Sequence, residues 1–137
     1  MRYYFVITFL IVSSTSFCQV RNYDDCKFDR LFVELQQRAS FGNDSTDIQK
    51  YFDSAFESNS ITLTGKILIE VYVDTAGTPC CNSIIKIKEE NIDFEEIKKL
   101  ITSMPKWNPG FQDGYKVNSS RNIVLSTNNE KLKVSIK

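Results

Sequence analysis

The cysteines and acidic residues offer the most reactive side chains in this sequence, because the chain contains no histidine. The absence of histidine removes the usual general base near neutral pH, the Ser–His and Cys–His nucleophile pairs, and the commonest zinc ligand. The paired carboxylates Glu89–Glu90 and Glu95–Glu96 adjoin a predicted helix start, where they complement the helix dipole. The sequence shows no spacing typical of metal ligands and no phosphate-binding glycine loop. We therefore expect a protein that is not an enzyme, with no catalytic residues, no metal and no cofactor.

The adjacent cysteines Cys80 and Cys81 raise the question of thiol redox chemistry. They lack the two-residue spacing that places a thiolate at a helix N-terminus in thioredoxin-like proteins, and a bond between them closes a strained ring. Cys26 can instead pair with Cys80 or with Cys81, which ties the beginning of the chain to a turn. Because three cysteines remain beyond residue 18, at least one thiol stays free or pairs with another chain.

Residues 1–18 resemble a secretory signal peptide. Their apolar stretch, residues 3–12, falls short of the roughly 20 residues that span a bilayer. Ser16 and Cys18 supply small side chains for cleavage directly after Cys18. Two alternatives remain: Cys18 is the lipidated cysteine of a bacterial lipoprotein, although bulky Phe17 precedes it, or the stretch is an uncleaved anchor. All three predict a periplasmic or secreted domain, in a compartment that permits disulfides.

Composition predicts one globular domain. The chain has 137 residues, of which 42% are hydrophobic and 12% aromatic, enough for a substantial core. Lys plus Arg and Asp plus Glu both count 17, so bulk charge gives no reason to expect a nucleic-acid partner.

Two amphipathic helices are predicted in an N-terminal extension, residues 19–60. The first, residues 25–37, has helical spacing of Phe28, Leu31, Phe32 and Leu35. A turn follows near Gly42. The second begins at a cap provided by Ser45, Thr46 or Asp47, and its apolar side consists of Ile48, Tyr51, Phe52, Ala55 and Phe56.

Residues 61–137 change to a β-rich pattern. Residues 66–73 alternate, with Ile67, Ile69, Val71 and Val73 on one face. After a turn, residues 80–88 form the returning strand of an antiparallel hairpin, with Cys81, Ser83, Ile85 and Ile87 on one face. A helix over residues 91–104 is capped by Asp93 and carries the apolar stripe Phe94, Ile97, Leu100, Ile101 and Met104. A third strand is predicted over residues 115–126, and a short fourth strand over residues 130–137.

The segment between that helix and the third strand holds the only tryptophan and two of the three prolines. Pro105 ends the helix, and Pro109–Gly110 makes a turn in which glycine can supply a positive φ. We expect Trp107 to cover the apolar layer between helix and sheet. Gly114 makes a second bend before the strand.

The order of these elements resembles the C-terminal domain of TonB-type energy transducers, especially the form common in Bacteroidetes. The Ser-Met-Pro-x-Trp-x-Pro-Gly segment and the strand after it match at Ser103, Met104, Pro105, Trp107, Pro109, Gly110, Asp113, Gly114 and Val117. The opening of the hairpin matches at Gly65, Lys66, Val71, Val73, Asp74 and Gly77. The resemblance implies a two-layer α+β fold, with residues 61–137 as the TonB C-terminal-like domain. Because the sequence shows neither the anchor nor the Pro-rich spacer of that family, we expect an isolated periplasmic domain.

The resemblance also implies a function, because TonB C-terminal domains bind an extended peptide of an outer-membrane receptor as an added strand. The expected edge is the last strand, residues 132–136, or the third strand, with Val117, Ser119, Arg121, Ile123 and Leu125. If the last strand covers the third, that site is blocked. We therefore expect a module that binds an envelope protein or peptide, with an outer-membrane transporter as one candidate. The alternative is a structural or accessory envelope protein with no peptide-binding role.

Overall fold

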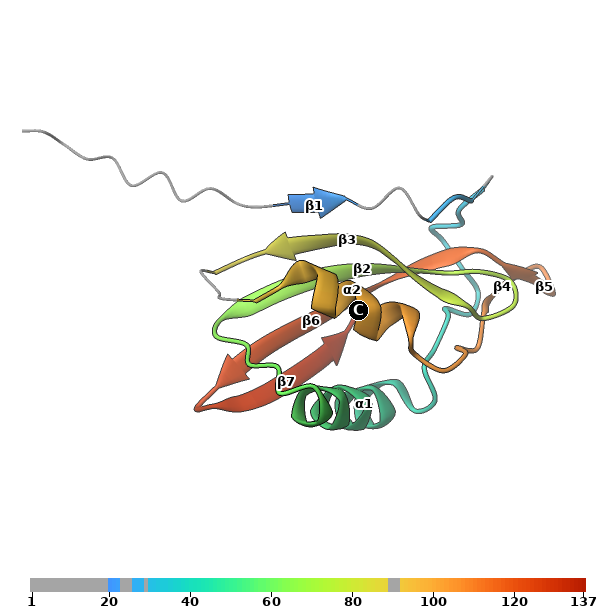
Figure 1. Ribbon diagram of the computed structural model, residues 1–137. Coiled ribbons are helices and arrows are strands. Elements are labelled where there is room, and N and C mark those ends of the chain that lie inside the picture. The colour runs from blue at the N-terminus through green and yellow to red at the C-terminus, as the bar shows by residue number, and fades with distance from the viewer. Residues whose placement is uncertain (1–19, 23–25, 29, 89–91) are drawn as a thin grey trace, which may run out of the picture.

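The computed structural model describes residues 20–22, 26–28, 30–88 and 92–137. Their elements follow the order β1 (Val20–Asn22), α1 (Asp44–Ser58), β2 (Lys66–Val73), β3 (Pro79–Lys86), α2 (Phe94–Thr102), β4 (Gly110–Gln112), β5 (Tyr115–Val117), β6 (Ser119–Asn128) and β7 (Lys131–Ile136) (Figure 1). A five-stranded antiparallel sheet has the order β1–β3–β2–β6–β7, and β4 pairs with β5 separately. The predicted α+β class is confirmed, while the predicted signal peptide lies outside the described residues.

The β2–β3 hairpin forms as the alternating sequence predicts, and all four inward side chains of β2 are fully buried. Its turn is held by the Asp74 carboxylate, which accepts hydrogen bonds from the N–H groups of Ala76 (2.9 Å) and Thr78 (2.8 Å). Gly77 has a φ of +81°, and an added Cβ there would lie 2.0 Å from the carbonyl oxygen of Trp107. Only glycine therefore permits this close contact between the turn and the segment after α2.

The predicted faces of β3 are correct only for its first half. Asn82 is an extra residue on β3 without a partner in the β2 register, which makes a β-bulge. A bulge reverses which residues point to each face beyond it. Ile84 is therefore fully buried opposite Ile69, and the prediction that Ser83, Ile85 and Ile87 share the face of Cys81 is wrong.

Helix α2 and the segment after it close the core as predicted. Asp93 caps α2 with its side chain, and the helix ends at Thr102, shortly before Pro105. Trp107 is only 3% exposed, and the centroid of its ring lies 5.5 Å from that of Phe41. The predicted aromatic cover over the apolar layer is confirmed.

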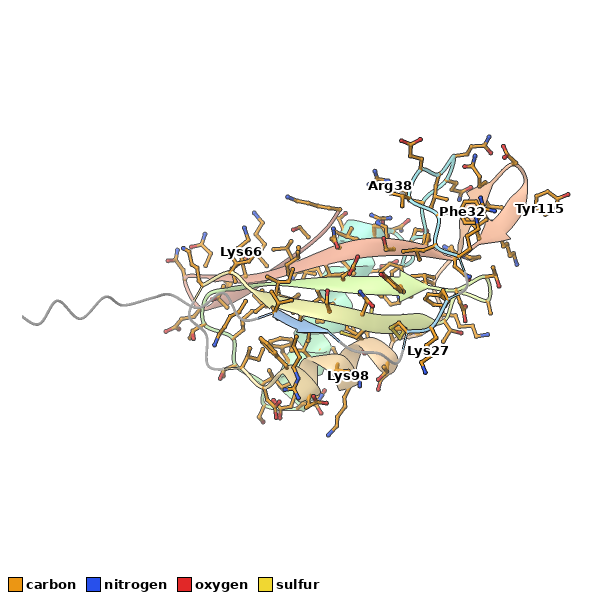
Figure 2. The ribbon with its side chains drawn as sticks, turned by 90° about the horizontal axis from the view of Figure 1, so that it is seen from above. Lys27, Phe32, Arg38, Lys66, Lys98 and Tyr115 are labelled. Carbon is orange, nitrogen blue, oxygen red and sulfur yellow. A yellow bond between two sulfur atoms is a disulfide. The ribbon has the colours of Figure 1, made fainter. Side chains whose placement is uncertain are left out.

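The first predicted helix is wrong. Residues 26–28 and 30–40, which we call the strap, are not helical. Figure 2 shows Phe32 and Arg38 of the strap at one end of the molecule, beside the hairpin that carries Tyr115. The apolar side chains at helical spacing belong to an extended chain that passes across the ends of several strands.

Backbone and ring contacts explain why the strap is extended. The N–H of Phe32 donates to the carbonyl of Asn118 (2.9 Å), and further backbone pairs join the strap to β4. The ring of Phe28 lies 5.6 Å from that of Tyr72 on β2. These tertiary contacts replace the hydrogen bonds that a helix would form within itself.

Two details of the segment before the third strand differ from the prediction. Gly110 does not adopt a positive φ; it begins β4, and an added Cβ would lie 2.9 Å from Leu35 Cδ1 of the strap. The bend at Gly114 is confirmed, because Asp113 (φ 51°) and Gly114 (φ 80°) form the β4–β5 turn. The predicted third strand is divided at Asn118 into β5 and β6.

Both sides of the predicted boundary between residues 60 and 61 contribute to one hydrophobic core. Helix α2 covers one face of the sheet, and α1 lies beside β7 (Figure 1). The second predicted helix is confirmed, but it begins at Asp44, before the predicted caps. The Asp44 carboxylate accepts from the N–H of Phe41, and the Asp47 carboxylate accepts from the N–H of Asn43, both at 2.8 Å. These bonds fix the turn before the helix and explain its earlier start.

Candidate functional site

The third strand, predicted to be the partner-binding edge, lies inside the sheet. β6 pairs with β2 on one side and with β7 on the other. The residues predicted to bind the partner are all buried, namely Val117, Ser119, Arg121, Ile123 and Leu125. The prediction is wrong because the chain turns at Asn129 and Glu130 and returns along β6 as β7.

Arg121 has a structural role instead. Its Nε donates to the carbonyl of Lys137 (3.2 Å), one terminal nitrogen donates to the carbonyl of Ala39, and the other pairs with the Asp44 carboxylate (3.2 Å). The residue is 8% exposed, so its charge depends on these partners for stabilisation. Arg121 therefore joins the end of β7, the strap and the start of α1.

β7 is an outer strand, and α1 closes its edge. In the antiparallel register with β6, Leu132, Val134 and Ile136 direct their backbone groups away from β6. The side-chain amide of Gln49 donates to the carbonyl of Leu132 (3.0 Å) and accepts from the N–H of Val134 (2.8 Å). A helix side chain thus occupies the place that a further strand would take.

The opposite edge of the sheet is closed by the first described residues. β1 pairs with residues 83–85 of β3, and Arg21 forms an ion pair with Glu95 of α2 at 3.1 Å. A disulfide between Cys26 and Cys80, one of the predicted pairings, attaches the strap to the same strand. This edge is covered by the backbone and covalent bonds of the chain itself.

Cys81 is the free cysteine in the described part of the chain, and its side chain is fully buried. Burial raises the pKa of its thiol to about 12, with smaller opposing effects from Lys98, which lowers the pKa, and Glu95, which raises it. A thiol with this pKa is protonated and unreactive near neutral pH. With Cys80 in a disulfide, the geometry does not favour redox chemistry at this pair.

A groove of about 750 Å³ lies beside the first residues of β7. It is bounded by the end of α1, the connector from α1 to β2, and the turn between β6 and β7, which lie at the same end of the sheet (Figure 1). We call it the α1–β7 groove and define it by Asp53, Phe56, Glu57, Leu63, Glu130 and Leu132. Its volume is within the range of about 300–1,000 Å³ typical of ligand sites.

The groove has an apolar floor and an acidic rim. Phe56 and Leu63 are buried, whereas Asp53, Glu57 and Glu130 are exposed. None of the residues that line the groove is a Lys or Arg. The arrangement can hold an apolar group and a positive charge close together.

This groove was not predicted, because no helix or strand was expected for the connector between α1 and β2. The available signal was the alternation of Ile61 and Leu63 with Thr62 and Thr64. This alternation places apolar side chains on one side of an extended connector.

Comparison of the chain with protein-family models, with curated proteins and with solved structures finds no match. The relationship to TonB-type domains therefore stays a prediction. Across residues 20–22, 26–28, 30–88 and 92–137, no helix is long and apolar enough to cross a membrane. Over the same residues, no group of three or more Cys, Asp or Glu side chains is arranged to hold a metal ion.

Proposed function

We propose that the chain is a non-enzymatic binding module of the cell envelope that holds a short segment of a partner protein in the α1–β7 groove. The observation that carries this proposal is the open groove, with its apolar floor and polar rim, next to an outer strand. The envelope location is supported by the sequence of residues 1–18 and by the Cys26–Cys80 disulfide, which suits an oxidising compartment.

The mode of binding differs from the addition of a full strand. β6 is covered by β7, and Gln49 bonds the middle of the outer side of β7. Leu132 lines the groove and directs its backbone away from β6. Because Gln49 already occupies the carbonyl of Leu132, a bound segment would pair with the beginning of β7 only through the Leu132 N–H and would place its side chains in the groove.

A structural or accessory envelope protein with no binding role is the second candidate function. The bonds from Gln49 to the outer side of β7 favour it, because covered backbone groups prevent pairing with other chains. The two candidates differ in whether the groove is occupied in the cell.

Photo-crosslinking in the source cells tests the proposal. The full chain carries the photoreactive residue p-benzoylphenylalanine at Thr62, an exposed residue of the groove. The control position is Lys116, an exposed residue of β5 outside the groove. We expect Thr62 to crosslink one envelope protein, with the reacted segment identified by mass spectrometry, and Lys116 not to crosslink it.

A groove-filling substitution completes the experiment. Thr64 is an exposed groove residue, so Thr64→Trp should fill the space without disturbing the core. We expect it to reduce the Thr62 crosslink about fivefold, because the tryptophan side chain excludes the bound segment on steric grounds. Absence of a crosslink at Thr62, or equal crosslinks at Thr62 and Lys116, would overturn the proposal and favour the accessory role.

A further inference from the structure

The floor of the α1–β7 groove would contact the stem of a bound side chain. Phe56 is 7% exposed and Leu63 is 6% exposed, so both belong to the hydrophobic core and present only their outer surface. Leu132 packs against the same core from β7. An apolar chain on this floor would extend the core outward.

The rim and the end of α1 make the mouth of the groove negative. Asp53, Glu57 and Glu130 are its charged residues, and Gln49 holds Asp53 in place by donating to it at 2.9 Å. The last turn of α1 contains no basic residue, although the C-terminal end of a helix carries partial negative charge and usually attracts one. The first turn of α1, by contrast, contains the acidic residues that complement its dipole. The negative charge at the groove is therefore left uncompensated by the lining residues.

Lysine and arginine side chains have the complementary structure, because an apolar stem ends in a cation. We infer that the α1–β7 groove binds an extended peptide segment through an arginine or lysine, with the stem on Phe56 and Leu63 and the cation at Glu57 and Glu130. This inference rests on the proposed function, since it names the chemistry of the segment that the groove holds. An acidic segment would be repelled, and a wholly apolar one would remove carboxylates from water without a partner.

A pair of short peptides tests the inference. The probe is acetyl-Gly-Leu-Arg-Leu-Gly-amide, and its control has Gln in place of Arg. We expect the Arg peptide to shift the NMR signals of the Phe56, Glu57 and Leu132 amides, and to bind about tenfold more tightly than the Gln peptide. The factor corresponds to two exposed ion pairs, each contributing about threefold.

Matched charge variants locate the effect. Glu57→Gln combined with Glu130→Gln should weaken binding of the Arg peptide about tenfold and remove most of its salt dependence. Glu34→Gln combined with Glu96→Gln makes the same change in net charge at exposed positions outside the groove. That control should retain the affinity and the salt dependence of the unchanged protein.

The failures of the inference and of the proposed function are distinguishable. The inference is overturned if the Arg peptide does not bind, if the Gln peptide binds equally well, or if the groove variant keeps its affinity. It is also overturned if Thr62 crosslinks a partner segment that lacks arginine and lysine, an outcome that leaves the proposed function in place. Selective peptide binding without a crosslinked partner would support the inference and refute the proposed function.

Discussion

The two edges of the five-stranded sheet are closed in different ways. On the β3 side, the chain adds its own strand β1 and a disulfide from Cys26 to Cys80. On the β7 side, helix α1 lies along the strand, and the amide of Gln49 makes two hydrogen bonds to it. The first closure adds backbone pairs and a covalent bond to β3, whereas the second covers the backbone groups of β7 with a helix side chain.

The difference indicates which edge remains available for binding. On the β3 side, β1 pairs with Ser83, Ile84 and Ile85 of β3, and the Cys26–Cys80 disulfide holds the strap to the same strand, so exposing these residues requires local unfolding. A helix can follow a strand only part of the way, and the α1–β7 groove is the space where the two separate. A rotation of the half-buried Gln49 side chain would break its bonds to Leu132 and Val134 and open these backbone groups without unfolding the strand. Closure by a helix therefore leaves a groove beside the strand that it covers.

Removal of the disulfide should have the largest effect and should act on the β3 edge alone. The bond joins residues separated by 54 positions. Cys26→Ser combined with Cys80→Ser should lower the free energy of unfolding by about 4 kcal/mol, because the unfolded chain regains the entropy of that loop. Urea unfolding followed by Trp107 fluorescence measures the loss, and hydrogen exchange locates it.

The control for the disulfide is Lys27→Ser, which changes an exposed strap residue beside Cys26. We expect its stability to change by no more than about 0.5 kcal/mol. Faster amide exchange in β1 and β3, with β7 unchanged, would agree with separate closure of the two edges. Equal acceleration in β7 would show that the edges are coupled.

Replacement of Arg121 should affect the opposite edge. Arg121→Met removes the guanidinium that donates hydrogen bonds to the carbonyls of Lys137 and Ala39 and to the Asp44 carboxylate. These acceptors then lack that partner. We expect a loss of about 3 kcal/mol, typical of breaking a buried charged contact. Urea unfolding gives the magnitude, and exchange should accelerate first at the end of β7.

Arg38→Met is the matched control, because Arg38 is an exposed arginine of the strap. It should leave the unfolding free energy within about 0.5 kcal/mol of the unchanged protein. A similar loss in both variants would mean that the buried contacts of Arg121 contribute little.

The elements that depend on neighbouring residues could be predicted from the sequence. The alternation of residues 66–73, the cap at Asp93 and the Asp113–Gly114 turn are local signals, and the structure contains each of them. Trp107 was assigned correctly because a lone indole after an apolar helix has few other places to pack.

The incorrect predictions concern contacts between distant segments. The helical spacing in the strap was overridden by backbone bonds to Asn118 and β4, far along the chain. One extra residue, Asn82, reversed which side chains face the core in the second half of β3. The order of strands could not be deduced from alternation, because alternation shows which residues face the core and not which strand lies alongside Ser119–Asn128. The groove depends on where α1 and β7 separate, so it also could not be predicted from local pattern.

The smallest expected change in the free energy of unfolding concerns Cys81, whose environment is the opposite of that of its neighbour Cys80. Cys80 is bonded to the strap, whereas Cys81 points into the core, where burial raises the pKa of its thiol from 9.0 to about 12. A folded-state pKa above the unfolded value means that this contribution to stability is complete below pH 9 and is lost as the pH rises toward 12. At pH 10 the loss should reach about 1.4 kcal/mol.

The measurement is the absorbance difference between the unchanged protein and Cys81→Ala at 240 nm, roughly the thiolate band. In the folded protein we expect no thiolate signal up to about pH 10. In urea, the thiol of the unfolded chain should titrate near pH 9. Titration near 9 in the folded protein would place Cys81 at a water-accessible position and would contradict the closed core beneath α2.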